Sequence, residues 1–201
     1  MKEKLVVLGA GESGIGAAIL GKQKGYEVFL SDINTIPLAL QNLLDEKEIR
    51  WESGQHSLNL MKEASIAVKS PGIPRDIPLL ERLRGNGTRI LSEIEFAAQA
   101  TSATLIGITG TNGKTTTTMM TYEILKNAGF HVGLAGNIGS SFAKQVAEED
   151  FEYYILELSS FQLDDIDQFS PHIALITNIT PDHLDRYGYS FESYIQAKLK
   201  I

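Results

Sequence analysis

A compact glycine-rich loop in the middle of the chain carries the residue types that bind a nucleoside triphosphate. The string Gly110-Thr111-Asn112-Gly113-Lys114-Thr115-Thr116 follows an apolar, strand-like run and precedes a segment of helical length. Backbone N–H groups of such a loop can cradle phosphate oxygens, Lys114 can neutralise the β- and γ-phosphates, and the Thr115 hydroxyl can ligate magnesium. A standard P-loop has glycine six positions before its lysine, where this chain has Ile108, so the loop is a shortened variant.

Two other polar side chains follow segments that have the pattern of buried strands. Glu157 ends the apolar run 153–157, so its carboxylate would lie at the C-terminal edge of a parallel sheet. There it could hold the magnesium ion shared with Thr115 and the ATP phosphates, unless it is only a solvated acid. His183 stands in a polar turn after the segment 173–177, which should lie beside the strand that precedes the glycine loop. The other three histidines are interpreted as structural or surface residues.

A second glycine-rich loop lies near the N-terminus. Gly9-Ala10-Gly11-Glu12-Ser13-Gly14 opens a helical segment, and Asp32 ends the next strand-like run. This order fits a dinucleotide-type fingerprint, in which glycines let the backbone approach a pyrophosphate at a helix N-terminus. The ligand stays open, because NAD, FAD and a UDP-sugar all carry a pyrophosphate, and a tight turn that binds nothing is the alternative. Ser70-Pro71-Gly72-Ile73-Pro74 is either a second ligand-facing loop of this region or a rigid turn.

Strand-like and helix-length segments alternate along the chain. Strands are expected at residues 5–8, 27–30, 66–69, 89–91, 104–109, 131–134, 153–157 and 173–177, and helices at 13–24, 93–100, 116–127 and 191–201. Strands separated by helices predict parallel sheets with right-handed crossovers. We predict an α/β protein with a Rossmann-like parallel-sheet N-terminal domain, residues 1–93, followed by an incomplete P-loop α/β central domain, residues 94–201.

The composition narrows the classes of partner. The net charge of −7 comes without a dense run of lysine and arginine, which argues against a nucleic-acid surface. The chain has no cysteine, so disulfides and thiolate metal sites are excluded. The apolar run near the N-terminus is too short for a signal peptide or a membrane span, and we expect a cytoplasmic protein without membrane insertion. The composition leaves the oligomeric state open.

Four strings together resemble one enzyme family. The string Gly110–Thr116 resembles the ATP loop of the Mur ligase and folylpolyglutamate synthetase superfamily. Three later strings narrow the resemblance to the Mur ligase family: Gly136-Asn137-Ile138-Gly139, Leu156-Glu157-Leu158-Ser159-Ser160-Phe161-Gln162-Leu163 and Asn178-Ile179-Thr180-Pro181-Asp182-His183-Leu184-Asp185-Arg186. The resemblance implies an ATP-dependent acid–amino acid ligase of peptidoglycan precursor synthesis, which adds D-glutamate to UDP-N-acetylmuramoyl-L-alanine through an acyl phosphate.

The same resemblance implies roles for individual residues. Catalysis would depend on Lys114, Glu157, His183 and Lys198, with two magnesium ions. His183 would hold the second magnesium together with Lys198, the lysine of an Ala-Lys-Leu string, once that lysine is carbamoylated by carbon dioxide. Asn137 and Ser159 would face the reacting end of the muramoyl substrate, and the uridine diphosphate would lie on Gly11, Ser13, Gly14, Asp32 and Ser70.

Two residues of the first loop region depart from the family pattern. Glu12 stands where an apolar residue is common, and Ile33 replaces a frequent hydroxyl residue after Asp32. Because of these departures, the sequence does not decide which residues contact the uridine. The expected role of the loop is unchanged.

Members of the family are longer and end in a third domain that brings the amino acid and closes over ATP. We therefore expect a fragment that lacks the C-terminal domain and part of the central sheet, and that is inactive by itself. Another Mur ligase, a folylpolyglutamate synthetase and a dinucleotide-binding regulatory module remain alternatives. A kinase or GTPase is disfavoured, because Asn178–Asp182 lacks the Asn/Thr-Lys-x-Asp pattern that reads a guanine base.

Overall fold

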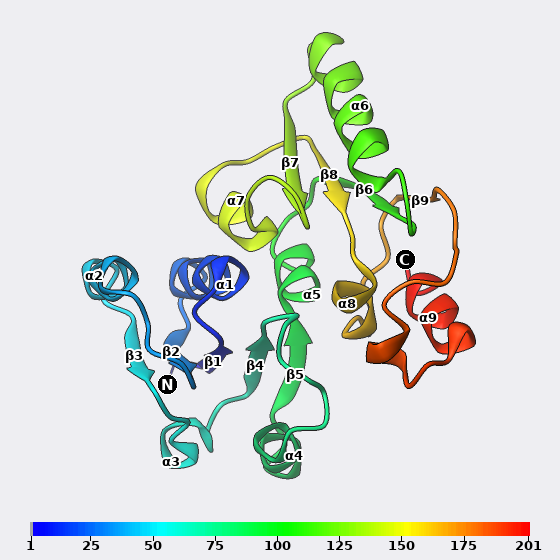
Figure 1. The fold of residues 1–201 in the computed structure, drawn as a ribbon. Coiled ribbons are helices and arrows are strands. Elements are labelled where there is room, and N and C mark those ends of the chain that lie inside the picture. The colour runs from blue at the N-terminus through cyan, green and yellow to red at the C-terminus, as the bar shows by residue number, and fades with distance from the viewer. Residues whose placement is uncertain (1) are drawn as a thin grey trace.

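The structure, a computed structural model that describes residues 2–201, contains two α/β units joined by one helix (Figure 1). The first unit contains β1 Lys4–Leu8, α1 Glu12–Gln23, β2 Glu27–Asp32, α2 Leu38–Glu46, β3 Arg50–Ser53, α3 Leu58–Met61, β4 Ile66–Lys69, α4 Pro78–Gly85 and β5 Arg89–Ser92. Helix α5, Glu93–Ala98, joins it to the second unit. That unit contains β6 Thr104–Thr109, α6 Lys114–Asn127, β7 Val132–Gly136, α7 Phe142–Glu148, β8 Tyr153–Glu157, α8 Ser160–Asp164, β9 Ile173–Ile176, the 3₁₀ helix η1 Leu184–Tyr187 and α9 Phe191–Lys198.

Both sheets are parallel throughout their described strands. The first has the order β3-β2-β1-β4-β5 and the second the order β7-β8-β6-β9. In each sheet the strand before a glycine loop, β1 or β6, has neighbours on both sides, so each loop opens at an inner position of the C-terminal edge. The predicted α/β class with parallel sheets is therefore confirmed.

Of the nine strands within residues 2–201, the sequence located eight and missed β3. This strand reads Arg50-Trp51-Glu52-Ser53 and lies at the edge of its sheet, next to β2. Its charged residues are exposed or only partly buried, and the run lacks the apolar pattern on which strand prediction depends. The helix after the second loop also begins at Lys114, two residues earlier than expected.

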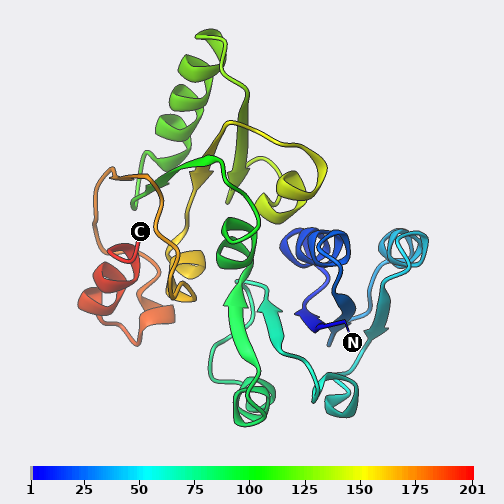
Figure 2. The ribbon, with the colours of Figure 1, turned by 180° about the vertical axis from the view of Figure 1, so that it is seen from behind.

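Alternating side chains of each sheet point into separate helical layers. Leu5 and Val7 of β1 lie in the core that α1 and α5 also build, whereas Val6 and Leu8 pack towards α3 and α4. The view from behind shows the two layers on opposite faces of the first sheet (Figure 2). In the second sheet, α6 packs on one face with Ile106 and its neighbours, and α7 lies on the other.

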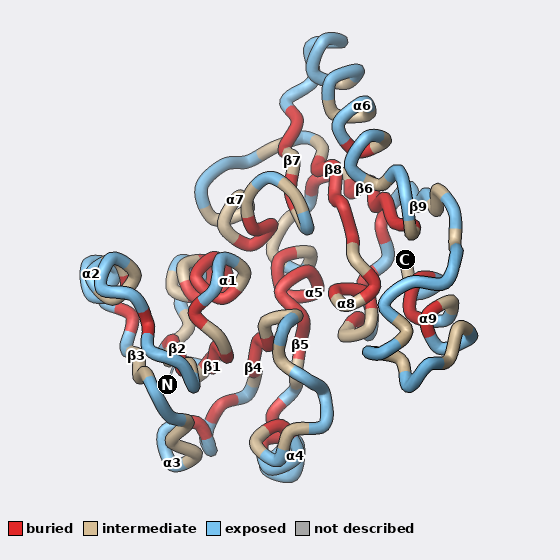
Figure 3. The backbone as a smooth tube through the Cα atoms, viewed as in Figure 1, coloured by how far each residue is buried: buried red, intermediate tan, exposed pale blue. Residues whose placement is uncertain are grey.

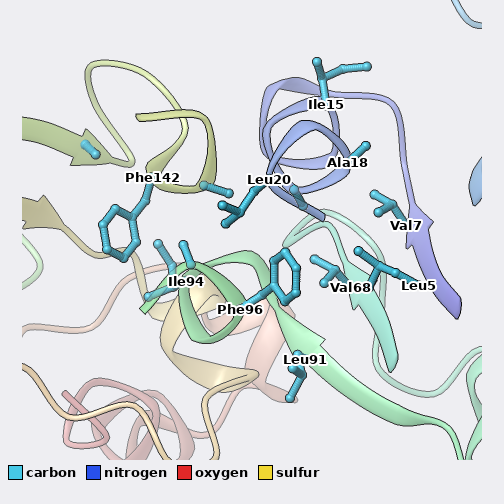
Figure 4. Close-up of a cluster of buried hydrophobic side chains, with 14 of the residues drawn as sticks. Leu5, Val7, Ile15, Ala18, Leu20, Val68, Leu91, Ile94, Phe96 and Phe142 are labelled. Carbon is cyan, nitrogen blue, oxygen red and sulfur yellow. The ribbon is translucent and has the colours of Figure 1, made fainter. Parts of the chain in front are cut away.

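One continuous core joins the two units. Leu20 of α1, Phe96 of α5 and Phe142 of α7 belong to the same cluster of buried side chains (Figure 4). Phe142 also contacts Tyr154 of β8, with ring centroids 5.0 Å apart. Because fully burying such a side chain contributes about 1.5–3 kcal/mol, this shared core fixes the two sheets relative to each other.

The outer side of the second unit is less covered than its centre. Ile173 and Leu175 of the edge strand β9 are 54% and 40% exposed, and Ile124 on α6 is 65% exposed. In Figure 3 the outer turns of α6 are exposed while the central strands are buried. No helix within residues 2–201 is long and apolar enough to cross a membrane.

Candidate functional site

The first glycine loop runs from β1 into α1. Two of its positions require glycine because there is no space for a Cβ atom. Gly9 has φ +95°, and a Cβ atom there would lie 2.7 Å from the Ser70 hydroxyl. A Cβ atom on Gly14 would lie 1.8 Å from the Gly9 carbonyl oxygen. The loop is thus closed tightly on itself, and its backbone can approach a ligand at the N-terminus of α1.

Asp32, at the end of β2, holds this loop in place. Its Oδ2 accepts a hydrogen bond from the Ala10 N–H at 2.6 Å, and its Oδ1 accepts one from the Asn34 N–H at 2.8 Å. Gly11 is exposed and Ser13 is half-buried in the first turn of the helix, so both remain open to a ligand. The structure therefore brings the predicted residues of the first loop together around Asp32.

Ser70 completes the first loop from the neighbouring strand. It follows β4, which pairs with β1, and its N–H donates to the Leu8 carbonyl at 3.0 Å. Its hydroxyl is buried against Gly9 and Gly14 and has no hydrogen-bond partner among the described residues. A buried polar group without a partner is uncommon and calls for an explanation, such as a ligand atom or water that it would meet.

Glu12 points away from the first loop and towards the second unit. Its Oε1 accepts a hydrogen bond from the Ser141 N–H at 3.1 Å, at the start of α7. The Ser141 hydroxyl in turn donates to Glu93 at 2.7 Å, and the Ala143 N–H donates to the same carboxyl oxygen at 2.6 Å. Glu12, the unusual acidic residue of the first loop, thus connects the two units by binding at the N-terminus of α7.

The second glycine loop runs from β6 into α6. Gly110 and Gly113 have φ +149° and +81°, and a Cβ atom on Gly110 would lie 1.9 Å from the Thr177 hydroxyl. The Lys114 ammonium donates to the carbonyl oxygens of Gly110 and Thr111 at 2.9 and 2.8 Å. The lysine is therefore folded over its own loop, where phosphate oxygens could replace the carbonyl oxygens.

Thr115 and Glu157 meet beside this loop. The Thr115 hydroxyl donates to Glu157 Oε2 at 2.7 Å, and the Asn137 side-chain amide donates to Glu157 Oε1 at 2.7 Å. Glu157 is only 1% exposed, and β8 pairs with β6 so that Glu157 lies opposite Ile108. A buried carboxylate beside a hydroxyl is a set of hard oxygen donors that suits magnesium.

Lys198 reaches the second loop from α9. Its side chain is 2% exposed, and its ammonium donates to the Gly110 carbonyl at 2.7 Å and lies 4.8 Å from the centre of the Tyr194 ring. Burial, with the positive charge of Lys114 as the second cause, lowers the pKa of Lys198 to about 8. A lysine of this kind has a larger neutral fraction near neutral pH than a surface lysine.

His183 and Ser159 have local partners. The His183 side chain is 57% exposed, its Nε2 lies 3.6 Å from Asp182 Oδ2, and its ring lies 5.4 Å from that of Phe161. Ser159 caps α8 in a capping box with Gln162. Neither residue hydrogen-bonds to Glu157 within residues 2–201, and no group of three or more histidine and acidic side chains forms a metal cage there.

Several residues that hold the second loop were not assigned a role from the sequence. The Asn178 side chain accepts from the Asn112 N–H at 3.1 Å, and the Thr177 hydroxyl donates to the Asn112 carbonyl at 2.7 Å. The Tyr194 and Thr111 hydroxyls lie 3.0 Å apart. Asn178 begins one of the strings that carry the family resemblance. Its position directly after a predicted strand could have identified it as a residue at the edge of the sheet near the loop.

Comparison with known families covers nearly the whole chain. The model for the Mur ligase MurD-like N-terminal domain matches residues 3–92, and the model for the Mur ligase middle domain matches residues 108–201. Both glycine loops lie inside these matches.

Curated relatives extend the likeness to single proteins. The chain is 55% identical over 199 residues to a UDP-N-acetylmuramoylalanine–D-glutamate ligase from Bacteroides thetaiotaomicron, covering 99% of this chain and 45% of that protein. It is 49% identical over 201 residues to the protein of the same name from Porphyromonas gingivalis strain W83, with 100% and 45% covered. The chain therefore spans a little under half the length of these relatives.

Solved structures agree in fold. A UDP-N-acetylmuramate:L-alanyl-gamma-D-glutamyl-meso-diaminopimelate ligase from Neisseria meningitides aligns with a TM-score of 0.65 at 20% identity, covering 100% of this chain and 68% of that chain. A UDP-N-acetylmuramate-alanine ligase from Thermotoga maritima aligns with a TM-score of 0.62 at 23% identity, covering 98% and 46%.

Proposed function

Because the chain belongs to the Mur ligase family, we propose that it is the nucleotide-binding part of an ATP-dependent ligase that adds D-glutamate to UDP-N-acetylmuramoyl-L-alanine. The observation that carries the proposal is the Thr115–Glu157 pair beside Lys114, since it joins a phosphate loop to a buried carboxylate. Such an enzyme would work with its nucleotide substrates in the cytoplasm.

The second glycine loop is the proposed ATP site. Backbone N–H groups of residues 110–116 would contact the phosphates, and Lys114 would exchange its two carbonyl contacts for phosphate oxygens. Positive charge at this point favours transfer of the γ-phosphoryl group to a carboxylate, because both reacting groups are anions. The resulting acyl phosphate is the activated form that an amine can attack.

Thr115 and Glu157 would hold the first magnesium ion. Both oxygens already lie 2.7 Å apart in this structure, so the site needs little rearrangement. Bound there, the ion would neutralise charge on the phosphates during transfer. The Asn137 side-chain amide holds Glu157 through its other carboxyl oxygen.

The second magnesium site would include His183 and a carbamoylated Lys198. The lowered pKa of Lys198, about 8, supports the modification, because only the neutral amine reacts with carbon dioxide. The Asp182 carboxylate, next to His183 in the chain, acts in the opposite direction and raises the pKa of Lys198. Intact-mass measurement of the protein in bicarbonate, with a Lys198→Arg variant as control, would detect the carbamate.

The first glycine loop is the proposed site of the uridine diphosphate. Gly11, Ser13 and Gly14 would contact the pyrophosphate, Asp32 would hold the loop, and the Ser70 hydroxyl would gain the partner that it lacks here. Asn137 and Ser159 are proposed to face the muramoyl-alanine end. With residues 1–93 as one domain and 94–201 as the next, the substrate would extend across the boundary.

Titration calorimetry on this chain would test the proposal. We expect binding of UDP-N-acetylmuramoyl-L-alanine and of ATP with magnesium, without ligation of D-glutamate by the 201 residues alone. NAD binding without UDP-sugar binding would support a dinucleotide-binding regulatory module instead. Binding of a folate in place of the UDP-sugar would support a folylpolyglutamate synthetase, and a preference for a UDP-muramoyl compound of different peptide length would support another Mur ligase.

A further inference from the structure

A fully buried lysine at the end of β4 connects the two units beside the Ser70 loop. Lys69 is 1% exposed, and its ammonium donates to the carbonyl oxygens of Ser70 and Ile73 at 3.2 and 2.6 Å. It also lies 2.6 Å from Asp165 Oδ2, at the C-terminal end of α8. One side chain thus fixes the loop backbone and reaches the other unit.

Asp165 receives a second cation on its other oxygen. Arg75 Nε lies 2.9 Å from Asp165 Oδ1, and the Asp165 side chain is only 10% exposed. Because desolvation offsets much of the attraction in a buried ion pair, such a pair is weak support for stability as such. Removing one partner is nevertheless costly, because the charge of the other partner is then left buried and uncompensated. The two residues must therefore stay in contact in the folded state. A pair of this kind is well suited to setting one arrangement of two elements.

The two elements that meet here carry proposed substrate residues. Ser70 stands next to Lys69, and Ser159 caps the N-terminus of the helix at whose other end Asp165 lies. A cavity of about 200 Å³ opens between them, lined by Pro71 and Ile73 of the loop and by Phe161 of the helix, among others.

We propose that Lys69 and Asp165 are positioning residues that set the Ser70–Ile73 loop at a fixed distance from α8. The inference rests on the proposed function, in which the uridine diphosphate lies at Ser70 and the reacting end near Ser159. Lys69 and Asp165 also line the cavity, and in this proposal they act by holding the loop and α8 in place. The pair thereby fixes the distance between the two ends of the substrate site, whereas the ATP loop lies on other elements.

Three variants separate positioning from stability: Lys69→Met, Asp165→Asn and the two combined. Asp165→Asn alone leaves a buried lysine without its carboxylate and should lower the thermal midpoint strongly. The double variant removes both charges and should recover most of that loss. We still expect it to bind UDP-N-acetylmuramoyl-L-alanine about ten- to a hundredfold more weakly, with unchanged affinity for ATP and magnesium, because small misplacements in a site are costly.

Hydrogen exchange followed by mass spectrometry gives a readout that needs no substrate. In the double variant, residues 70–76 should exchange faster, while α1 and α7 keep their protection. Removing the exposed Lys4–Glu63 pair of the same unit, by Lys4→Met with Glu63→Gln, should change neither binding nor exchange at the loop.

Each outcome decides the proposal. A stable double variant that binds the UDP substrate like the wild type, with a protected loop, would show that the pair only stabilises the fold. If the wild type does not bind this substrate, the proposed function fails, and exchange at residues 70–76 still tests the positioning role. Faster exchange would then support it, and unchanged exchange would reject it.

Discussion

The two glycine loops occupy equivalent places in their sheets, but different side chains surround them. The first loop, Gly9–Gly14, has the neutral Ser70 hydroxyl against it, and Asp32 orders its backbone. The second loop, Gly110–Thr116, has two lysines, Lys114 and Lys198, on its carbonyl oxygens and the buried Glu157 beside it.

This difference matches the different chemistry that each loop would perform. A loop that only recognises a pyrophosphate can use backbone N–H groups and a close steric fit, because the ligand leaves unchanged. A loop at which a phosphoryl group is transferred needs cations placed where negative charge develops. Substitutions that act on shape should therefore impair the first loop, and substitutions that act on charge the second.

The largest effect should come from shape at the first loop, with Gly14→Ala. The added Cβ would meet the Gly9 carbonyl oxygen at 1.8 Å, and a backbone atom cannot rotate aside. We expect a loss of about 3 kcal/mol in the free energy of unfolding, the upper range for overpacking, and loss of UDP-substrate binding. Urea denaturation and calorimetry would measure both.

Gly11→Ala is the matched control for this change. Gly11 has φ −71° and no atom within 4 Å of the added Cβ, so its stability should change by no more than about 0.5 kcal/mol. An equal loss of unfolding free energy in Gly14→Ala and Gly11→Ala would mean that the loop does not pack closely against Gly14.

Charge at the second loop should give the next largest effect, with Lys114→Met. The variant keeps the length of the side chain and removes charge-assisted hydrogen bonds to phosphate. We expect ATP and magnesium to bind about a hundredfold more weakly, equivalent to about 2–3 kcal/mol, in calorimetric titrations. The affinity for the UDP substrate should not change.

Lys126→Met, in the last turn of the same helix, is the control, because Lys126 lies over Tyr122 and away from the loop. If Lys114→Met weakened the binding of ATP and of the UDP substrate equally, the proposal that each loop binds a different ligand would be wrong.

The same contrast shows what the sequence could and could not reveal. Both loops, and the strand ends that carry Asp32 and Glu157, were predictable because each motif is local and parallel strands end at one edge. The contacts between the units, Glu12 with Ser141 and Lys69 with Asp165, join residues far apart in sequence. The first pairing depends on how α1, α5 and α7 pack and the second on where α8 lies relative to β4, and no local pattern encodes either arrangement. Strand β3 was missed because it lies at an edge, where burial imposes no apolar repeat.

A smaller effect concerns Glu93, which contacts the start of α7 through Ser141 and Ala143 and so helps to hold the two units together. Burial raises the pKa of Glu93 to about 6, above an ordinary value of 4.5, although hydrogen bonds from Ala143 and Ser141 oppose the rise. The folded state therefore keeps this proton at pH values where the unfolded chain has lost it. Its contribution to stability is complete below pH 4.5 and is lost as the pH rises through about 6.

Glu93→Gln removes this titration and retains an oxygen that can accept both hydrogen bonds. The difference in unfolding free energy between wild type and variant should change by about 2 kcal/mol between pH 4 and 7, at 1.36 kcal/mol per pKa unit. Chemical denaturation across that range would measure it, with the exposed Glu123→Gln as control. A pH-independent difference would contradict the buried, ionisable state of Glu93.

The smallest effect should come from Ser70→Ala, and it sharpens the comparison because binding and stability should respond differently. The hydroxyl is buried without a partner in this structure, so its removal should leave the folded chain as stable as before or slightly more stable. The UDP substrate should bind about tenfold more weakly, since a hydrogen bond to the charged pyrophosphate contributes at least about 1.5 kcal/mol. Calorimetry and thermal unfolding would measure the pair of effects, with Ser65→Ala, an exposed serine before β4, as control. Unchanged affinity would mean that the pyrophosphate lies away from Ser70, and that the first loop recognises its ligand through backbone groups alone.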